Sequence, residues 1–209
     1  MGKAIIFDVD GTLIHTSMNL VNAVVKKIID ELSYGEFSPE KVSRFWWGDK
    51  NISRRELIEL EFKISFDDFI PLFRNHTMNF DYVKQFKKLY KDVKPVLDEL
   101  LFRGIPLGVV TDAPSYIVVP QLNYFLGNGY FSEVIMTHEL ENVRDKPAPD
   151  GLLLCMEKLG TRDAIFVGDS DSDIVAAQSA GIPAILIERG EHETYAKPDR
   201  TIKTLYELL

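Results

Sequence analysis

Cysteine is nearly absent from this 209-residue chain, which contains a single one, Cys155. No disulfide can therefore form within the chain. Cys155 lies among leucines in the segment GLLLCMEKLG, a context typical of a packed helix position rather than a catalytic thiol. A lone cysteine is compatible with a reducing compartment, and we expect a cytoplasmic protein.

Long apolar runs and long basic runs are also missing. No stretch approaches 18 apolar residues, and the N-terminus lacks the basic-then-apolar pattern of a signal peptide, so we expect neither a membrane span nor secretion. The 32 acidic residues outnumber the 24 Lys and Arg, which gives a formal net charge of −8. This balance argues against nucleic acid or an anionic membrane as a partner and favours small-molecule chemistry.

Several well-known site motifs do not occur. The sequence has no GxxxxGK[ST] phosphate loop, no GxGxxG dinucleotide motif, no HExxH and no CxxC. The four histidines, His15, His76, His138 and His192, are scattered along the chain, and we assign none of them a catalytic role.

The pattern that is present indicates an α/β fold. From residue 95 onward, segments with helical spacing alternate with short apolar runs, as in βαβ units around a parallel sheet. The runs that fit buried strands are Lys3 to Phe7, Leu107 to Thr111, Glu133 to Met136, Ala164 to Val167 and Ala184 to Ile187.

An insertion follows the first strand. About eighty residues without strand-like alternation separate it from the second, and we predict an all-helical domain at residues 15–91 within a core formed by residues 1–14 and 92–209. Its aromatic residues are expected mostly to form its own core. Helical spacing is found at Leu20 to Leu32, Arg54 to Phe62 and Tyr82 to Tyr90.

Polar residues end three of the predicted strands. Asp8 follows the first, Thr111 ends the second, and Asp169 comes soon after the fourth. Each alone would more often be a turn former or a helix N-cap. Because the carboxyl ends of parallel strands meet at one edge of a sheet, the three together predict a site there.

The ordered set of motifs resembles the haloacid dehalogenase superfamily, in its phosphatase branch. The resemblance rests on IIFDVDGTLI at residues 5–14, Thr111, RDKPAPDGLLLCMEKLG and VGDSDSDIVAAQSAG. It implies a Rossmann-like core with strand order 5-4-1-2-3 in order of appearance. The inserted helices match the cap of the phosphoglycolate phosphatase and β-phosphoglucomutase-like members.

The resemblance assigns the central chemistry to four aspartates and a lysine. Asp8 is implied as the nucleophile that forms an aspartyl-phosphate, and Asp10 as the acid/base that serves the leaving group and the attacking water. Mg²⁺ is the implied cofactor, held by Asp8, the backbone carbonyl of Asp10, and Asp169, with Asp173 farther out. Lys146 is implied as a positive charge beside Asp8 and the phosphoryl oxygens.

Phosphate binding is implied for Gly11, Thr12, Thr111, Asp112 and Lys146. Gly11 has no Cβ, so the backbone can fold back toward a phosphate there. Asp112 departs from the pattern, because many relatives have Asn at this position. An ionised carboxylate only accepts hydrogen bonds, so we expect the backbone amide of Asp112, and not its side chain, to contribute.

One part of the insertion resembles the family's substrate-specificity loop. Trp47, Gly48, Lys50, Arg54 and Arg55 are the candidate residues there, with Lys50 able to meet an anionic group of the substrate. A solvated helix start is an equally good interpretation of the basic residues.

These features predict a Mg²⁺-dependent phosphatase that acts on a small phosphorylated metabolite as a monomer or homodimer. A phosphosugar mutase or a phosphonoacetaldehyde hydrolase on the same core remains an alternative, as does a non-catalytic binding protein that keeps the fold. A dehalogenase is disfavoured, because carbon–halogen displacement needs neither Asp10 as acid/base nor a metal.

Overall fold

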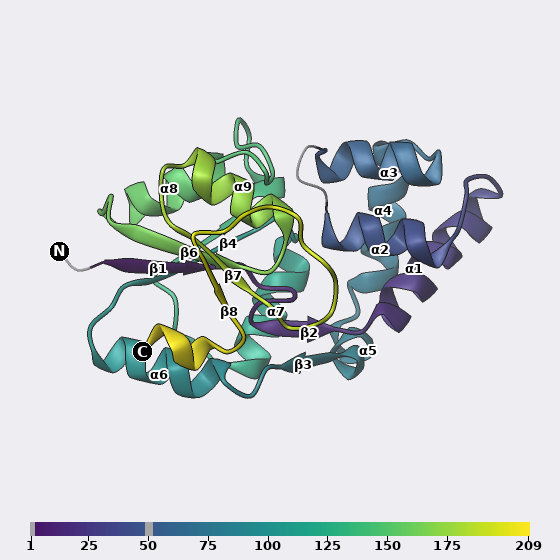
Figure 1. Cartoon of the computed structure of the whole chain (residues 1–209). Coiled ribbons are helices and arrows are strands. Elements are labelled where there is room, and N and C mark those ends of the chain that lie inside the picture. Colours follow the sequence, from purple (N-terminus) through teal and green to yellow (C-terminus); the bar gives the residue numbers. More distant parts are fainter. Residues whose placement is uncertain (1–2, 49–51) are drawn as a thin grey trace.

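A computed structural model describes residues 3–48 and 52–209 of the chain. Figure 1 shows a sheet flanked by helices on one side of the molecule and a group of helices, α1–α4, on the other. Two short strands, β2 and β3, lie between these parts.

Six strands of the described chain form one parallel sheet, in the order β5-β4-β1-β6-β7-β8. This confirms the expected α/β class and strand order, with one further edge strand. The sequence does not predict β8, because this three-residue strand, Arg-Thr-Ile, has no apolar run. Its first two residues are exposed. The strands are β1 (Ala4–Phe7), β4 (Leu107–Thr111), β5 (Glu133–Met136), β6 (Ala164–Gly168), β7 (Ala184–Ile187) and β8 (Arg200–Ile202).

Two hydrophobic clusters cover the two faces of this sheet. Side chains alternate along β1, so Ile5 and Phe7 enter one cluster while Ala4 and Ile6 enter the other. Helices α6 (Val93–Phe102) and α7 (Ser115–Phe125) and the 3₁₀ helix η3 (Leu205–Leu208) contribute to the first cluster; α8 (Asp150–Lys158) and α9 (Asp171–Ser179) contribute to the second. The two clusters cover the faces of the sheet, so the loops at the carboxyl ends of the strands are available to form a site.

The inserted helices have a core of their own. Serine side chains cap the N-termini of the first four, and Phe45, Phe62, Phe69 and Phe73 pack ring against ring at their centre. The helices are α1 (Met18–Leu32), α2 (Pro39–Trp47), α3 (Arg54–Phe62), α4 (Phe66–Thr77) and α5 (Phe80–Val83).

A two-stranded antiparallel sheet joins the insertion to the core. Strand β2 (Ile14–Thr16) pairs with β3 (Lys87–Leu89). The prediction of a helix from Tyr82 to Tyr90 is therefore wrong: α5 ends at Val83, and the 3₁₀ helix η1 (Lys84–Phe86) leads into β3. Local spacing does not reveal a strand whose partner lies about seventy residues earlier in the chain.

The division of the chain into a core and a cap at residues 15–91 stays a prediction of domain organisation. The described part contains one further 3₁₀ helix, η2 (Thr137–Glu139). Among the residues that the structure describes, no helix has the length and apolarity needed to cross a membrane.

Replacement of Phe69 by alanine should destabilise the inserted helices. The ring is fully buried and lies 5.5 Å from the ring of Phe45 and 5.6 Å from that of Phe62, measured between centroids. We expect the free energy of unfolding to fall by about 3–5 kcal/mol, measured by urea denaturation followed by circular dichroism. Leu60→Ala, at an exposed position of α3, should change it by less than about 0.5 kcal/mol. Equal losses in the two variants would contradict this packing.

Candidate active site

A tight turn follows the central strand β1. Asp8 directly follows β1, and the chain then folds back so that the amides of Leu13 and Ile14 both donate to the carbonyl of Val9. Gly11 has φ +86°, and a Cβ at this position would lie 2.1 Å from Oδ2 of Asp169. Only glycine allows this turn to approach Asp169 so closely.

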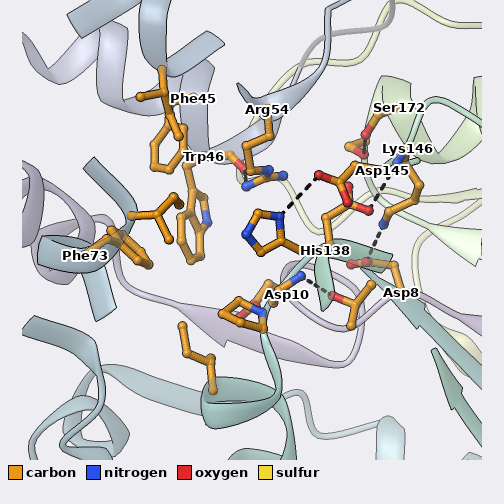
Figure 2. A pocket seen from close by; sticks show the side chains of 18 of the residues that line it. Asp8, Asp10, Phe45, Trp46, Arg54, Phe73, His138, Asp145, Lys146 and Ser172 are labelled. Carbon is orange, nitrogen blue, oxygen red and sulfur yellow. Dashed lines mark hydrogen bonds and ion pairs between the residues drawn. The ribbon is translucent and has the colours of Figure 1, made fainter. Parts of the chain in front are cut away.

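Lys146 links the turn after β1 to helix α9 at this edge of the sheet. Its Nζ atom lies 2.6 Å from Oδ1 of Asp8 and 2.6 Å from Oδ1 of Asp173, and all three side chains are buried (Figure 2 labels Asp8 and Lys146). An ammonium has three protons and no acceptor, so two carboxylates can share it. The lysine thereby fixes the carboxylate of Asp8 in one orientation.

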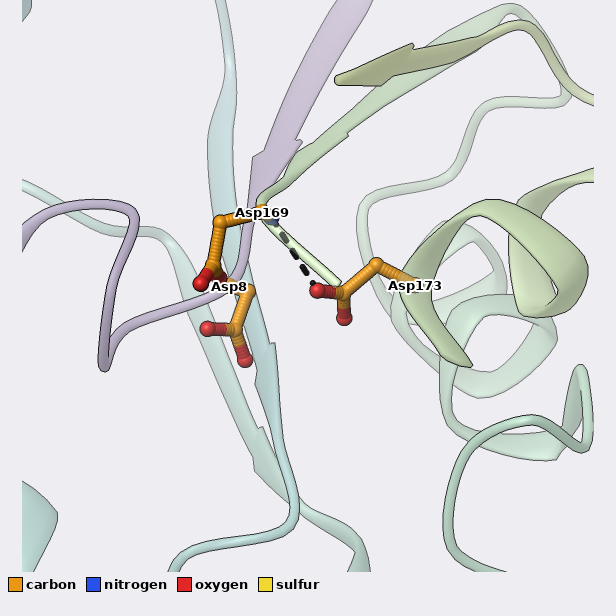
Figure 3. A group of neighbouring side chains, drawn as sticks. All are labelled: Asp8, Asp169 and Asp173. Atoms are coloured by element: carbon orange, nitrogen blue, oxygen red, sulfur yellow. Dashed lines mark hydrogen bonds between the residues drawn. The ribbon is translucent and has the colours of Figure 1, made fainter. Parts of the chain in front are cut away.

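Three buried carboxylates gather around this point. Asp8, Asp169 and Asp173 each offer an oxygen, and these oxygens lie within 4.8 Å of one another (Figure 3). Asp169 follows β6, and Asp173 lies in the first turn of α9. Oδ2 of Asp173 accepts hydrogen bonds from the amides of Asp169 and Ser170 at 3.2 and 3.0 Å, which holds the loop between strand and helix.

The charges of this cluster shift its pKa values in opposite directions. Burial, with the neighbouring Asp173, raises the pKa of Asp8 to about 8 although Lys146 opposes the shift. Burial and the neighbouring carboxylates of Asp173 and Asp8 raise the pKa of Asp169 as well. Burial also acts to raise the pKa of Asp173, but Lys146 and Ser170 outweigh it, so that pKa is lowered. Asp173 is therefore the natural ion-pair partner of Lys146.

The donor set fits a divalent cation. One ammonium does not balance three buried carboxylates, and a hard cation with oxygen ligands would stabilise their ionised forms. Asp173 already has Lys146 and Ser170 as partners. The carboxylate of Asp169 accepts a hydrogen bond from Thr12 at 3.1 Å and lies 3.8 Å from the His192 ring nitrogen. Asp8 and Asp169 are thus the carboxylates best placed to hold a metal.

The carboxylate of Asp10 lies beside a second buried lysine that the sequence analysis missed. Oδ1 of Asp10 accepts hydrogen bonds from Nζ of Lys87 at 2.8 Å and from the hydroxyl of Thr16 at 2.7 Å. Lys87 comes from β3 and Thr16 from β2, so the two linker strands hold this side chain. Lys87 stands next to the exposed Lys88, and the sequence offers no signal that separates the two.

Of the other residues predicted to bind phosphate, Thr111 and Asp112 line a cavity and Thr12 contacts Asp169. Thr111 lies at the end of β4 and lines a cavity together with Asp112 and Lys146. The carboxylate of Asp112 contacts the hydroxyl of Thr137 at 2.8 Å and accepts from the backbone amide of Lys146 at 3.1 Å. It therefore holds the loop that carries the lysine. The hydroxyl of Thr12 points to Asp169.

This cavity has a volume of about 340 Å³ and lies between the sheet edge and the inserted helices. Figure 2 shows Asp8 and Lys146 on one side of it and Phe45 and Phe73 on the other. The size falls within the range of roughly 300–1,000 Å³ that is typical of small-molecule sites. The cavity therefore extends from the buried carboxylates into the insertion.

The predicted specificity residues are only partly brought together. Trp47 and Arg54 line the cavity, whereas Arg55 lies over the ring of Phe66, with its guanidinium carbon 3.8 Å from the ring centroid. Gly48 has φ +84° and ends α2. Lys50 lies outside the described residues.

Two histidines that we left without a role lie at the site. The His192 ring stacks on that of Trp47, with 4.3 Å between the centroids, so this residue of the sheet domain contacts the insertion. His138 lines the cavity and lies 3.6 Å from Asp145, whose charge helps to raise the histidine pKa. Contacts between segments that are distant in the sequence bring both histidines to the site. No local sequence motif therefore marks either position.

Comparisons with known proteins agree with this geometry. Residues 5–187 match the family model described as haloacid dehalogenase-like hydrolase. A phosphoglycolate phosphatase of Shigella dysenteriae is 29% identical over 99% of this chain and 91% of its own length. The crystal structure of a phosphatase from Thermococcus onnurineus is 27% identical with a TM-score of 0.67, covering 99% of this chain and 96% of its own. That of CbbY from Rhodobacter sphaeroides, in complex with phosphate, shares the fold with a TM-score of 0.79 at 21% identity, covering 100% and 96%. The chain therefore belongs to the haloacid dehalogenase-like hydrolases.

Proposed function

We propose that this chain is a Mg²⁺-dependent phosphatase that hydrolyses a small phosphate monoester through an aspartyl-phosphate on Asp8. The observation that carries the proposal is the buried Asp8 carboxylate, oriented by Lys146 at one end of a cavity of small-molecule size. The similarity to relatives named as phosphatases supports it.

In the first step, an oxygen of the Asp8 carboxylate attacks phosphorus, and the bond from phosphorus to the ester oxygen breaks. The departing alkoxide takes a proton from the carboxyl group of Asp10 and leaves as the alcohol, and Asp10 remains as a carboxylate. Lys146 orients the nucleophile and places a positive charge beside the phosphoryl group. Thr111 and the amide of Asp112 are proposed as further phosphate contacts.

In the second step, water attacks the phosphorus of the aspartyl-phosphate and gives its proton to Asp10. The bond between phosphorus and the Asp8 oxygen breaks, which releases inorganic phosphate and restores the Asp8 carboxylate and the protonated Asp10. The same residue thus serves as acid and then as base, and the contacts from Lys87 and Thr16 position it for both tasks.

Asp8, the backbone carbonyl of Asp10, and Asp169 are the proposed ligands of the metal, with Asp173 as an outer partner. When bound, Mg²⁺ would supply positive charge to the phosphoryl oxygens and to the crowded carboxylates. The oxygen-only donor set is the supporting observation for this metal.

The alternatives differ in what they need from the cavity. A phosphonoacetaldehyde hydrolase uses a lysine of the insertion to form a Schiff base, and no lysine from the described part of the inserted helices lines the cavity. A mutase would retain the phosphoryl group for a returning sugar. The cytoplasmic location and the monomeric or homodimeric state remain predictions.

Asp8→Asn tests the proposed activity. The amide keeps the shape of the side chain but removes the nucleophilic charge, so we expect hydrolysis of p-nitrophenyl phosphate in Mg²⁺ to fall by at least about 1,000-fold. Circular dichroism checks that the fold is retained, and Asp163→Asn, at an exposed aspartate, is the control. Substantial turnover by Asp8→Asn would overturn the covalent mechanism, and absence of turnover in the unmodified protein would overturn the phosphatase proposal.

Metal binding should stabilise the protein more at high pH than at low pH. In the metal-free protein the pKa of Asp8 is raised from 3.8 to about 8, so the folded state binds more protons than the unfolded state between these values, and stability falls as pH rises through that range. Mg²⁺ needs the ionised carboxylates and reverses this loss. We expect a larger increase in melting temperature on adding Mg²⁺ near pH 8 than near pH 5.5, measured against NaCl of equal ionic strength. Equal increases at the two pH values would contradict the assignment.

Lys87→Met should impair the step that uses Asp10. Its loss removes the buried cation that holds this carboxylate, so we expect kcat to fall by roughly 10–100-fold for an alkyl phosphate, whose leaving group needs a proton. The loss should be smaller for p-nitrophenyl phosphate, whose leaving group is stable as an anion. Lys88→Met, at the exposed neighbour on the same strand, is the matched control. Equal losses on both substrates would count against a positioning role.

A further inference from the structure

The end of the cavity farthest from Asp8 has an apolar wall. Helix α4 contributes most of it, and α2 and α3 supply the rest (Figure 2 labels Phe45 and Phe73). These side chains also belong to the core of the insertion or pack against it, so their positions are fixed by neighbours on several sides. The apolar wall comprises Phe45, Ile58, Phe66, Phe69, Ile70 and Phe73, of which Ile58 and Phe69 are fully buried and support the others from the core of the insertion.

The two arginines of the described lining each contact a neutral group. Arg54 donates to the carbonyl oxygen of Trp46 at 3.1 Å. Burial raises the pKa of Asp112 although the charges of Lys146 and Arg54 oppose the shift, and His138, Thr137 and Arg54 together lower the pKa of Asp145 against its burial. Arg74 is exposed and lies over the ring of Tyr116, with its guanidinium carbon 5.5 Å from the ring centroid. An anionic group of a substrate would gain little where it lies against the phenyl rings of the apolar wall rather than beside a guanidinium.

On the basis of the phosphatase function above, we propose that the substrate is a phosphate monoester whose organic group ends in an apolar body, aromatic or branched aliphatic, seated against the apolar wall. The phosphate lies at Asp8 and Lys146, and the ester oxygen faces Asp10. Arg54 and His138 lie between the two ends in Figure 2 and meet any polar group near the phosphate.

The physical reason is the difference in desolvation between apolar and charged groups. An apolar body gains free energy when it leaves water for this wall, whereas a carboxylate placed against phenyl rings loses hydration without a partner. A compact two-carbon acid such as phosphoglycolate reaches the polar part of the cavity only. This chain therefore differs in its preferred substrate from relatives named for phosphoglycolate.

The test compares alkyl phosphates with matched leaving groups. We would measure kcat/KM in Mg²⁺ for 2-phenylethyl phosphate, glycerol 3-phosphate and phosphoglycolate, because the first two release primary alcohols of similar acidity. We expect 2-phenylethyl phosphate to be preferred by at least about tenfold. Equal values, or a preference for either polar ester, would overturn the inference and leave the phosphatase in place. No Mg²⁺-dependent turnover of these esters or of p-nitrophenyl phosphate would overturn the proposed function itself.

A matched pair of variants locates the preference on the apolar wall. Ile70 and Leu72 are both half-buried residues of α4 that pack against the same core, but only Ile70 lines the cavity. In Ile70→Asn we expect the ratio of kcat/KM for 2-phenylethyl phosphate to that for glycerol 3-phosphate to fall about tenfold. Leu72→Asn, which carries a similar cost in stability, should keep the original ratio. An unchanged ratio in Ile70→Asn, or the same fall in both variants, would overturn the placement.

Discussion

The buried ammonium of Lys146 is the interaction on which the candidate site depends. It lies between the carboxylates of Asp8, which directly follows the central strand β1, and Asp173, which lies in helix α9. Without it, three carboxylates would share a buried volume and two of them would lose the ammonium that they contact. Asp112 in turn holds the backbone of Lys146, so the residue that departs from the family pattern supports the lysine.

The inserted helices complete the site in two ways. Strands β2 and β3, which lead into and out of the insertion, place Thr16 and Lys87 around Asp10 and so connect the proposed acid/base to the joint between the two parts of the chain. Helix α4 supplies most of the apolar wall at the other end of the cavity. In the proposed function, the sheet edge carries the reacting groups and the insertion carries the surface that distinguishes one substrate from another.

The sequence predicted the fold and the gathering of the strand-end residues, because apolar runs and polar strand ends are local signals that a parallel sheet brings to one edge. It did not predict β3, Lys87, the place of His138 in the cavity lining or the stacking of His192 on Trp47. Lys87 and Lys88 look alike in sequence, and only the pairing of β3 with β2 makes one buried and the other exposed. The apolar residues of α4 were expected as core, and their second role as a cavity wall depends on how the helix faces the sheet.

The central claim is that Asp8 carries the phosphoryl group. The most direct measurement is a single turnover of p-nitrophenyl phosphate in Mg²⁺, quenched in acid and treated with borohydride, which reduces an acyl phosphate to an alcohol. Mass spectrometry of the peptides then locates the modified residue. The account predicts the alcohol at Asp8 and an unmodified Asp10. Modification of another residue, or product release with no modified carboxylate at any quench time, would contradict it.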